Sequence, residues 1–334
     1  MVLYTRHGEI TLGRTVSRAG EGVVAEIAGS PAHVVKIFHG LGSKGSLLSA
    51  NHDPERRLRK VAVMAEHRPE HSVQADGHVV LSWPEEILLE DGKPVGYVMP
   101  RIEWTQVMEL RDLVGVAPGA RTPAHIPAWA AKFPWQYRVH TAINLCHAVE
   151  VVHSTGGVIG DFNERNVLVS PQALVSLVDI DSMQFVGPGG EIFPCDVGHR
   201  DFTAPELFGV DLTQVTRTRD SDYFALAIHI HRLLLGGVHP FLGGAWTGQG
   251  ERKSGSELAR LGQYVGGPPP SMLAFSPREP DPKRLPTAIR TMFDQAFRIG
   301  AKKPSARPSA VEWARALDDM LARLQAQRVA RGTT

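Results

Sequence analysis

The chain has 334 residues, of which 43% are hydrophobic and 21% charged, a balance typical of a folded globular protein. Lysine and arginine number 36 against 35 aspartates and glutamates, so charge gives no reason to expect a nucleic acid or an anionic membrane as main partner. The two cysteines, Cys146 and Cys195, exclude a disulfide framework and favour a cytoplasmic location. Residues 1–9 lack a signal-peptide core and no apolar run reaches about 18 residues, so we expect no membrane association.

The N-terminal part of the chain is predicted to form mainly β-strands. β-Branched residues between turn formers indicate strands at residues 23–27, 33–38, 79–83 and 95–102. One helix interrupts them, because Asp53 is a suitable N-cap, Pro54 suits the first helical position, and apolar residues then recur at helical spacing. Proline, alanine and glycine in residues 114–134 favour a linker or insertion, so we expect a lobe boundary near residues 100–105.

The remainder is predicted to be mainly helical. Apolar residues three and four positions apart indicate helices at residues 135–153, 223–235, 286–297 and 311–328. Short β-like runs at 167–169 and 175–178 predict a small hairpin between the first two helices, and long loops are expected at 236–250 and 267–287. This order predicts an α+β fold with a small β-rich lobe that contains one main helix, followed by a larger, mainly α lobe.

A glycine pattern occupies the expected turn between the first strands. Residues 20–27 follow G-x-G-x-x-G-x-V, with Gly20 and Gly22 in the first two glycine places, Ala25 in the third and Ile27 in the last. Such a turn can bring backbone N–H groups close to the phosphates of a nucleotide. The alternative is an ordinary glycine hairpin.

Lys36 lies inside an apolar strand, where an unpaired ammonium group is costly and an anionic partner is therefore expected. Phosphate oxygens are one such partner. Glu55, in the first turn of the expected helix, could pair with Lys36 and hold it toward a nucleotide; Glu66 is the rival, at the far end of that helix. The alternative is an exposed lysine and a solvated glutamate.

The segment around the small hairpin carries three polar residues at intervals typical of phosphotransfer. Asp161 is followed five residues later by Asn166, and Asp179 comes directly after the apolar run 175–178. This order suits a base, a metal-binding amide and a metal-binding carboxylate. Magnesium prefers oxygen ligands and keeps phosphates and waters in its shell, so one Asn and one Asp suffice. The alternative is a chance polar loop.

Further motifs make the chain similar to protein kinases over residues 10–325. Ala204-Pro205-Glu206 matches the A-P-E motif, Asp222 begins a run that resembles the D-x-W-S-x-G helix start, and Arg307 stands where a late arginine pairs with the A-P-E glutamate. The chain resembles a bacterial eukaryotic-like Ser/Thr protein kinase. The amino-acid sequences of residues 96–100, 160–166 and 178–182 most resemble those of the subgroup associated with tellurite-resistance and phosphatase gene clusters.

The resemblance implies ATP and Mg²⁺ as cofactors, an N-lobe at residues 1–102 and a C-lobe at residues 103–334. It implies that Lys36 contacts the α- and β-phosphates of ATP and that Glu55 anchors Lys36. The hinge that hydrogen-bonds adenine would run from Met99 through Arg101 to Ile102, although Pro100 in its middle has no N–H.

For the chemistry, the resemblance implies that Asp161 orients the acceptor hydroxyl and accepts its proton, and that Asn166 and Asp179 hold magnesium. Three departures qualify this pattern. Ile159-Gly160 replaces the usual His-Arg before the catalytic aspartate, so the arginine that receives an activation-loop phosphate is missing. Asn163 replaces a lysine that steadies the phosphate, which leaves that task to Arg165, to another cation or to no residue at all. Asp181 replaces a glycine and either caps a turn, which we favour, or adds a metal ligand.

The implied function is transfer of phosphate to Ser or Thr hydroxyls of proteins, including autophosphorylation, with a phosphatase as a further partner. A second hypothesis is a nucleotide-binding pseudokinase scaffold, and a third is a small-molecule kinase, which Asn163 and Asp181 favour and the A-P-E motif opposes. Metal binding by His229 and His231 is not expected, since residues two apart on a helix point to different faces.

Overall fold

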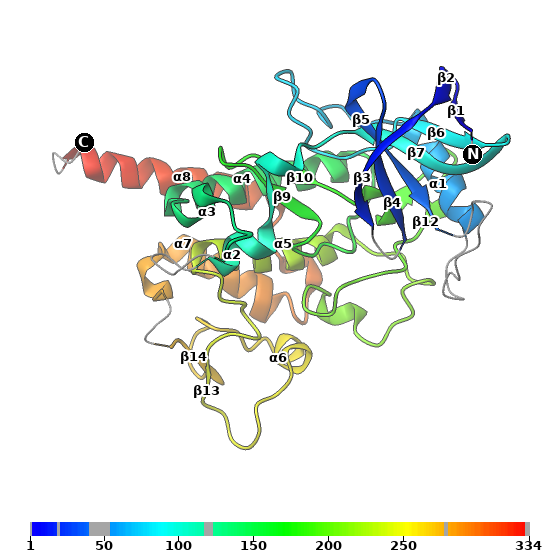
Figure 1. The fold of residues 1–334 in the computed structure, drawn as a ribbon. Helices are drawn as coiled ribbons and strands as arrows, with labels where there is room; N and C mark the ends of the chain where they lie inside the picture. The colour runs from blue at the N-terminus through cyan, green and yellow to red at the C-terminus, as the bar shows by residue number, and fades with distance from the viewer. Residues whose placement is uncertain (1, 19–20, 40–53, 117–122, 277–279, 331–334) are drawn as a thin grey trace.

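The computed structural model describes residues 2–18, 21–39, 54–116, 123–276 and 280–330. A curled β-sheet with one flanking helix forms the N-terminal part, and helices are the main regular elements of the rest (Figure 1). This confirms the predicted α+β class and the bilobal, protein-kinase-like arrangement. None of the helices in these ranges is long and apolar enough to cross a membrane.

The N-terminal sheet has seven antiparallel strands in the order β2-β1-β6-β7-β5-β4-β3. Side-chain alternation divides its core between two faces: Val35 and Ala25 pack on one side, whereas Val34, Lys36 and Tyr97 lie on the side that faces the helix and the second lobe. The strands are β1 (Leu3–Thr5), β2 (Gly8–Ile10), β3 (Leu12–Arg18), β4 (Gly22–Ile27), β5 (Ser30–Phe38), β6 (Glu86–Glu90) and β7 (Lys93–Pro100).

The strand predicted at residues 79–83 is wrong. Val79 and Leu81 form only isolated bridges, and the strand that joins the sheet is β6. Leu81 and Trp83 are fully buried in the core of the second lobe instead, and the Trp83 indole donates to the Met64 carbonyl at 2.8 Å. The apolar character of this segment therefore reflects burial between the lobes rather than pairing in a sheet.

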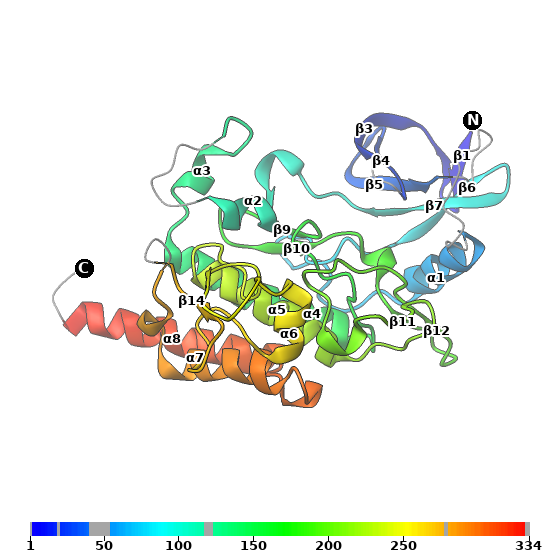
Figure 2. The ribbon, with the colours of Figure 1, turned by 90° about the horizontal axis from the view of Figure 1, so that it is seen from below.

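Helix α1 (Pro54–Glu66) is the one main helix of the first lobe. Leu58, Val61 and Met64 recur at three-residue spacing and are buried, so this face packs toward the protein interior. The helix lies beside the sheet and close to the short strands β11 and β12 of the second lobe (Figure 2). The proposed N-cap, Asp53, lies outside the described residues.

The second lobe is built on the buried helices α4 and α5, with α8 packed along α4. The predicted hairpin forms, since β9 pairs with β10 and adds β8 as a third strand. The helices are α2 (Leu110–Gly115), α3 (Ala128–Ala131), α4 (Trp135–Ser154), α5 (Arg219–Leu234), α6 (Gly255–Leu261), α7 (Thr287–Asp294), which continues as a π-helical turn, and α8 (Ala310–Ala330).

The remaining strands are short: β8, β9 and β10 form a three-stranded sheet, whereas β11 pairs with β12 and β13 pairs with β14. The segment 114–134, predicted as a linker, contains part of α2 and all of α3. The predicted loops at 236–250 and 267–287 contain one strand each, and these two strands pair with each other. The strands are β8 (Met108–Glu109), β9 (Val167–Val169), β10 (Val175–Leu177), β11 (Phe185–Val186), β12 (Ile192–Phe193), β13 (Ala245–Trp246) and β14 (Leu273–Ala274).

Candidate active site

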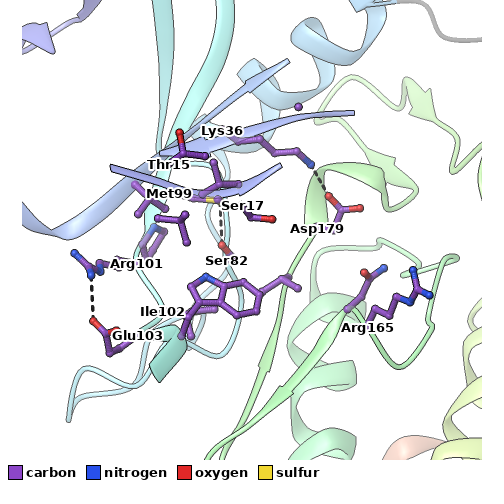
Figure 3. A pocket seen from close by; sticks show the side chains of 18 of the residues that line it. Thr15, Ser17, Lys36, Ser82, Met99, Arg101, Ile102, Glu103, Arg165 and Asp179 are labelled. Carbon is purple, nitrogen blue, oxygen red and sulfur yellow. Dashed lines mark hydrogen bonds and ion pairs between the residues drawn. The ribbon is translucent and has the colours of Figure 1, made fainter. Parts of the chain in front are cut away.

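A cleft of about 560 Å³ lies between the N-terminal sheet and the loops of the second lobe (Figure 3). Its walls come from β3, β4, β5 and β7, from the segment after β7, and from the loops on either side of the β9–β10 hairpin. Most of the residues singled out in the sequence meet here: Gly22, Lys36, Met99, Arg101, Ile102, Asn166 and Asp179.

Gly22 begins β4 at the edge of the cleft. A Cβ atom at this position would lie 2.5 Å from the Ile37 carbonyl oxygen, so only glycine allows the backbones of β4 and β5 to approach this closely. Gly20 lies outside the described residues. The structure does not bring Ala25 to the cleft, because strand alternation turns it into the core on the opposite face of the sheet, where it is 3% exposed.

Lys36 is buried and held by carboxylates. Its ammonium group donates hydrogen bonds to Asp179 Oδ1 and, at 2.7 Å, to Asp181 Oδ1. The Tyr97 hydroxyl donates to the same oxygen of Asp181 at 2.7 Å, and Glu21 Oε2 lies 3.9 Å from the ammonium. This cluster explains how a lysine is tolerated inside an apolar strand.

The structure does not bring Glu55 to Lys36. Within the described residues, the carboxylates less than 4 Å from Lys36 Nζ belong to Glu21, Asp179 and Asp181, whereas Glu55 is exposed in the first turn of α1. The helix supplies a cation instead: Arg57 Nη2 lies 2.9 Å from Glu21 Oε2, and Arg57 Nε lies 3.8 Å from Asp181 Oδ2.

Asp181 was expected either to cap a turn or to bind a metal, and the prediction of a turn cap is wrong. The hydrogen bond that closes its turn comes from the Ser182 hydroxyl to the Asp179 carbonyl at 2.8 Å, while the Asp181 carboxylate is fully buried against Lys36 and Tyr97. Burial by itself would raise the pKa of this carboxyl, but Lys36 and Arg57 hold it well below its usual range. Asp181 is therefore ionised at neutral pH.

The electrostatics of the cluster differ for its other members. Burial would lower the pKa of Lys36, yet Asp181 and Asp179 raise it above the ordinary lysine value, so the ammonium stays charged. The pKa of Asp179 is raised by burial and by the neighbouring carboxylates, which outweigh the opposing effect of Lys36. Of the two aspartates, Asp179 is thus protonated more readily than Asp181.

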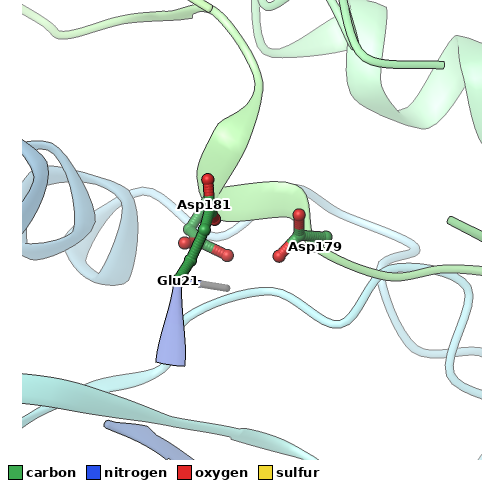
Figure 4. A group of neighbouring side chains, drawn as sticks. All are labelled: Glu21, Asp179 and Asp181. Carbon is green, nitrogen blue, oxygen red and sulfur yellow. The ribbon is translucent and has the colours of Figure 1, made fainter. Parts of the chain in front are cut away.

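Three carboxylates, from Glu21, Asp179 and Asp181, have oxygens within 4.8 Å of one another (Figure 4). Oxygen donors of this kind suit a hard divalent cation. The Lys36 ammonium already makes ion pairs with all three, so the centre of the group is occupied by that charge. Asp179 and Glu21 also line the cleft, and so does Asn166, the residue paired with Asp179 as a metal ligand in the sequence.

The catalytic-loop residues are held in a fixed geometry. The His199 backbone N–H donates to Asp161 Oδ1 at 2.9 Å, and Asn166 Nδ2 donates to the Asp161 carbonyl at 3.0 Å, which leaves the Asn166 amide oxygen available as a ligand. Buried Asp222, at the start of α5, accepts the backbone N–H groups of Ile159 and Gly160 at 2.7 and 2.9 Å. Two backbone donors to one carboxylate orient the loop rigidly.

Gly160 stands where the related pattern has arginine, and the structure shows why. Its φ is +74°, and an added Cβ would lie 2.7 Å from both Arg217 Nη1 and Cys195 Sγ. Arg217 is buried, donates to the Val197 carbonyl, and its backbone N–H donates to the Gln184 side chain at 2.8 Å. An arginine from elsewhere in the chain thus fills this space and binds the segment after Asp181 through Gln184 and Val197.

Two further sequence interpretations can be placed. Arg307 donates two hydrogen bonds to the Glu206 carboxylate, both 2.6 Å, which confirms the expected pairing of the A-P-E glutamate with the late arginine. Asn163 is buried and accepts the Arg165 backbone N–H at 2.9 Å, while the Arg165 side chain is exposed and lines the cleft. Arg165 is thus a cation within reach of a ligand in the cleft.

Sequence reasoning missed four residues of the site: Arg57, Tyr97, Glu21 and Arg217. A signal for the first was present, because residues 56–60 of α1 carry four basic side chains on a helix whose one face is buried. The extra carboxylate of Asp181 was a second signal, since a buried acid needs cations around it. Neither signal says which side chains meet.

A two-lobed fold with a lysine, a metal-type aspartate and an asparagine around one interlobe cleft defines a protein-kinase-like molecule. Comparisons agree with this class. The chain is 29% identical over 323 residues to the protein named Protein kinase YegI from Escherichia coli O157:H7, and 28% identical over 330 residues to that from strain K12. The alignments cover 95% and 97% of this chain but 46% of each relative, so the chain spans less than half the length of these relatives. No family model matches the chain.

Proposed function

We propose that this chain transfers the γ-phosphate of ATP, with Mg²⁺, to Ser or Thr hydroxyls of proteins, its own included. The observation that carries the proposal is the meeting of Lys36 and Asp179, 143 positions apart in the sequence, in a cleft that Gly22 and Asn166 also line. The similarity to two proteins named as protein kinases supports phosphotransfer in general.

For the nucleotide, we assign residues 1–102 to the lobe that clamps ATP and residues 103–334 to the lobe that binds the protein substrate. The Arg101 N–H is already used, since it donates to the Ala32 carbonyl at 2.8 Å, and Pro100 has no N–H. Ile102 is therefore the residue whose backbone donates to adenine, with Met99 packed beside the ring. Lys36 binds the α- and β-phosphates beside the backbone of Gly22, and Gly20 is assigned to the same phosphate-binding turn from the sequence.

For the metal, Asp179 and the amide oxygen of Asn166 are the proposed ligands. Both line the cleft, and the hydrogen bond from Asn166 Nδ2 to the Asp161 carbonyl directs the nitrogen away from that role. When bound, magnesium would neutralise charge on the phosphate oxygens. Lys36 is bound to Asp179 Oδ1, so Oδ2 is the oxygen of Asp179 that would hold the ion.

For the acceptor, Asp161 is the proposed base. His199 N–H occupies Oδ1, so Oδ2 is the oxygen that receives the proton of the Ser or Thr hydroxyl. Arg165 is the proposed cation that steadies the transferred phosphate in place of the usual lysine. The bidentate pair between Glu206 and Arg307 supports a protein substrate, because it stabilises the part of the second lobe that follows the A-P-E motif.

The test is an assay with γ-labelled ATP, Mg²⁺ and a generic protein substrate. Asp161→Asn should abolish transfer and leave ATP binding nearly intact, since this carboxylate positions the acceptor and not the nucleotide. The matched control is Asp319→Asn, an exposed carboxylate on α8. Full activity of Asp161→Asn would show that Asp161 is not the catalytic base.

The same assay separates the competing functions. Absence of transfer by the wild-type chain, with magnesium-dependent ATP binding retained, would identify a pseudokinase scaffold. Transfer only to a small molecule would identify the third function, although the packing of Asp181 against Lys36 removes one of the two residues that favoured it. Membership of the tellurite-associated subgroup, a partner phosphatase and a cytoplasmic location remain proposals that rest on the sequence.

A further inference from the structure

We propose that Asp181 is the residue that positions Lys36 for phosphate binding, and that Arg57 of α1 holds Asp181 in place. This inference rests on the proposed function. In the resembled kinases a glutamate of the helix performs the first task, and here Glu55 is exposed and away from Lys36. In this chain the carboxylate that binds the lysine comes from the loop after Asp179 and not from the helix.

Of the two aspartates that bind Lys36, Asp181 is the one suited to a permanent role. Its side chain is 0% exposed, whereas that of Asp179 is 34% exposed and faces the cleft. Asp179 would share its charge between Lys36 and the metal, whereas Asp181 is fully buried and also accepts a hydrogen bond from the Tyr97 hydroxyl. Lys36 therefore retains one fixed partner when the nucleotide arrives.

The charges of the cluster explain why α1 contributes arginine. Glu21, Asp179 and Asp181 carry three negative charges, and Lys36 and Arg57 carry two positive ones. A glutamate at the position of Arg57 would leave four carboxylates around a single buried ammonium, and uncompensated buried charge is strongly destabilising.

Arg57 also links three separate parts of the site. It bridges α1 to Glu21 beside the glycine turn, at 2.9 Å, and to Asp181 of the metal loop, at 3.8 Å. Asp181 Oδ2 is buried and has no hydrogen bond among the described residues, so a small movement of α1 that brings Arg57 closer would satisfy it.

A double-mutant cycle between Asp181→Asn and Lys36→Met tests the inference in the full chain. Losing a hydrogen bond to a charged group should weaken Mg²⁺–ATP binding by about tenfold or more in each single variant. If Asp181 acts through Lys36, the double variant should bind no more weakly than the worse single variant. The control is Glu191→Gln, which removes an exposed carboxylate on the loop between β11 and β12. This variant should leave Mg²⁺–ATP binding unchanged, and its effect should add to that of Lys36→Met.

The binding readout keeps this test separate from the proposed function, because transfer by the wild-type chain is measured independently. Additive losses in the cycle, or near-wild-type binding by a folded Asp181→Asn, would overturn the role of Asp181. If Asp181→Asn does not melt cooperatively, Arg57 decides: Arg57→Met should weaken ATP binding and raise KM for ATP, and Arg57→Lys should restore most of both. Equal behaviour of the two Arg57 variants would also overturn the inference.

Discussion

Lys60 of α1 is a buried cation outside the Lys36 cluster, and it allows a quantitative prediction. Its side chain is 5% exposed, and burial is the main influence on its pKa, which falls from 10.5 to about 8. Asp181 and Asp196 oppose this effect only in part, and Arg57 adds to it. At neutral pH Lys60 therefore stays charged in the folded protein, although its burial disfavours the charged form.

The cost follows from linkage. Each pH unit of difference between folded and unfolded pKa corresponds to about 1.4 kcal/mol, so charged Lys60 lowers the free energy of unfolding by about 3 kcal/mol at pH 7. Between pH 8 and 10.5 the unfolded chain binds more protons at this site than the folded protein, so this penalty declines as pH rises. Lys60→Met removes the charge and fills a similar volume, so the variant should be more stable by about 3 kcal/mol at pH 7 and by less than half of that at pH 9.5.

Thermal melts of both proteins at pH 7, 8.5 and 9.5 measure the difference. The expected rise in Tm at pH 7 is about 5 °C. Lys93→Met, at the exposed start of β7, is the matched control and should change stability by less than about 0.5 kcal/mol at each pH. The reasoning is refuted if Lys60→Met melts at or below the wild-type temperature at pH 7, or if its advantage does not shrink with rising pH.

Three further predictions concern other parts of the molecule. Gly160→Arg should not restore phosphate control but lower the free energy of unfolding by about 2 kcal/mol or more, because Arg217 already fills the space; a normal Tm would contradict this. Complete dephosphorylation, verified by intact mass, should leave most of the activity, since Ser182 is the one hydroxyl residue between Asp181 and Thr203 and is buried; a reversible loss of about a hundredfold would refute it. Stability should fall as pH drops from 6.5 toward 4, because burial lowers the pKa values of three histidines to about 3 or 4 and the unfolded chain takes up protons first; melts that are unchanged at pH 4.5 would exclude this for His229, His231 and His239.

The sequence alone determined the fold class and the order of the candidate site. The helical periodicity of α4 and α8 and the hairpin β9–β10 are local patterns, and local patterns survive folding because they arise from residues close together in the chain. The pairing of Glu206 with Arg307 was also accessible, because the resemblance to protein kinases implies it from the A-P-E motif and the position of the late arginine.

Only the tertiary structure decided which side chains meet. Lys36 and Asp181 are 145 positions apart, and nothing in their spacing distinguishes a turn cap from a buried ion-pair partner. Arg217 fills the space above Gly160 for the same reason: the two are adjacent only after α5 docks on the catalytic loop. The segment 79–83 has the composition of a strand, but Leu81 and Trp83 are drawn into the core of the second lobe. Burial and ion pairing depend on which distant surfaces pack together, and that is a property of the whole fold.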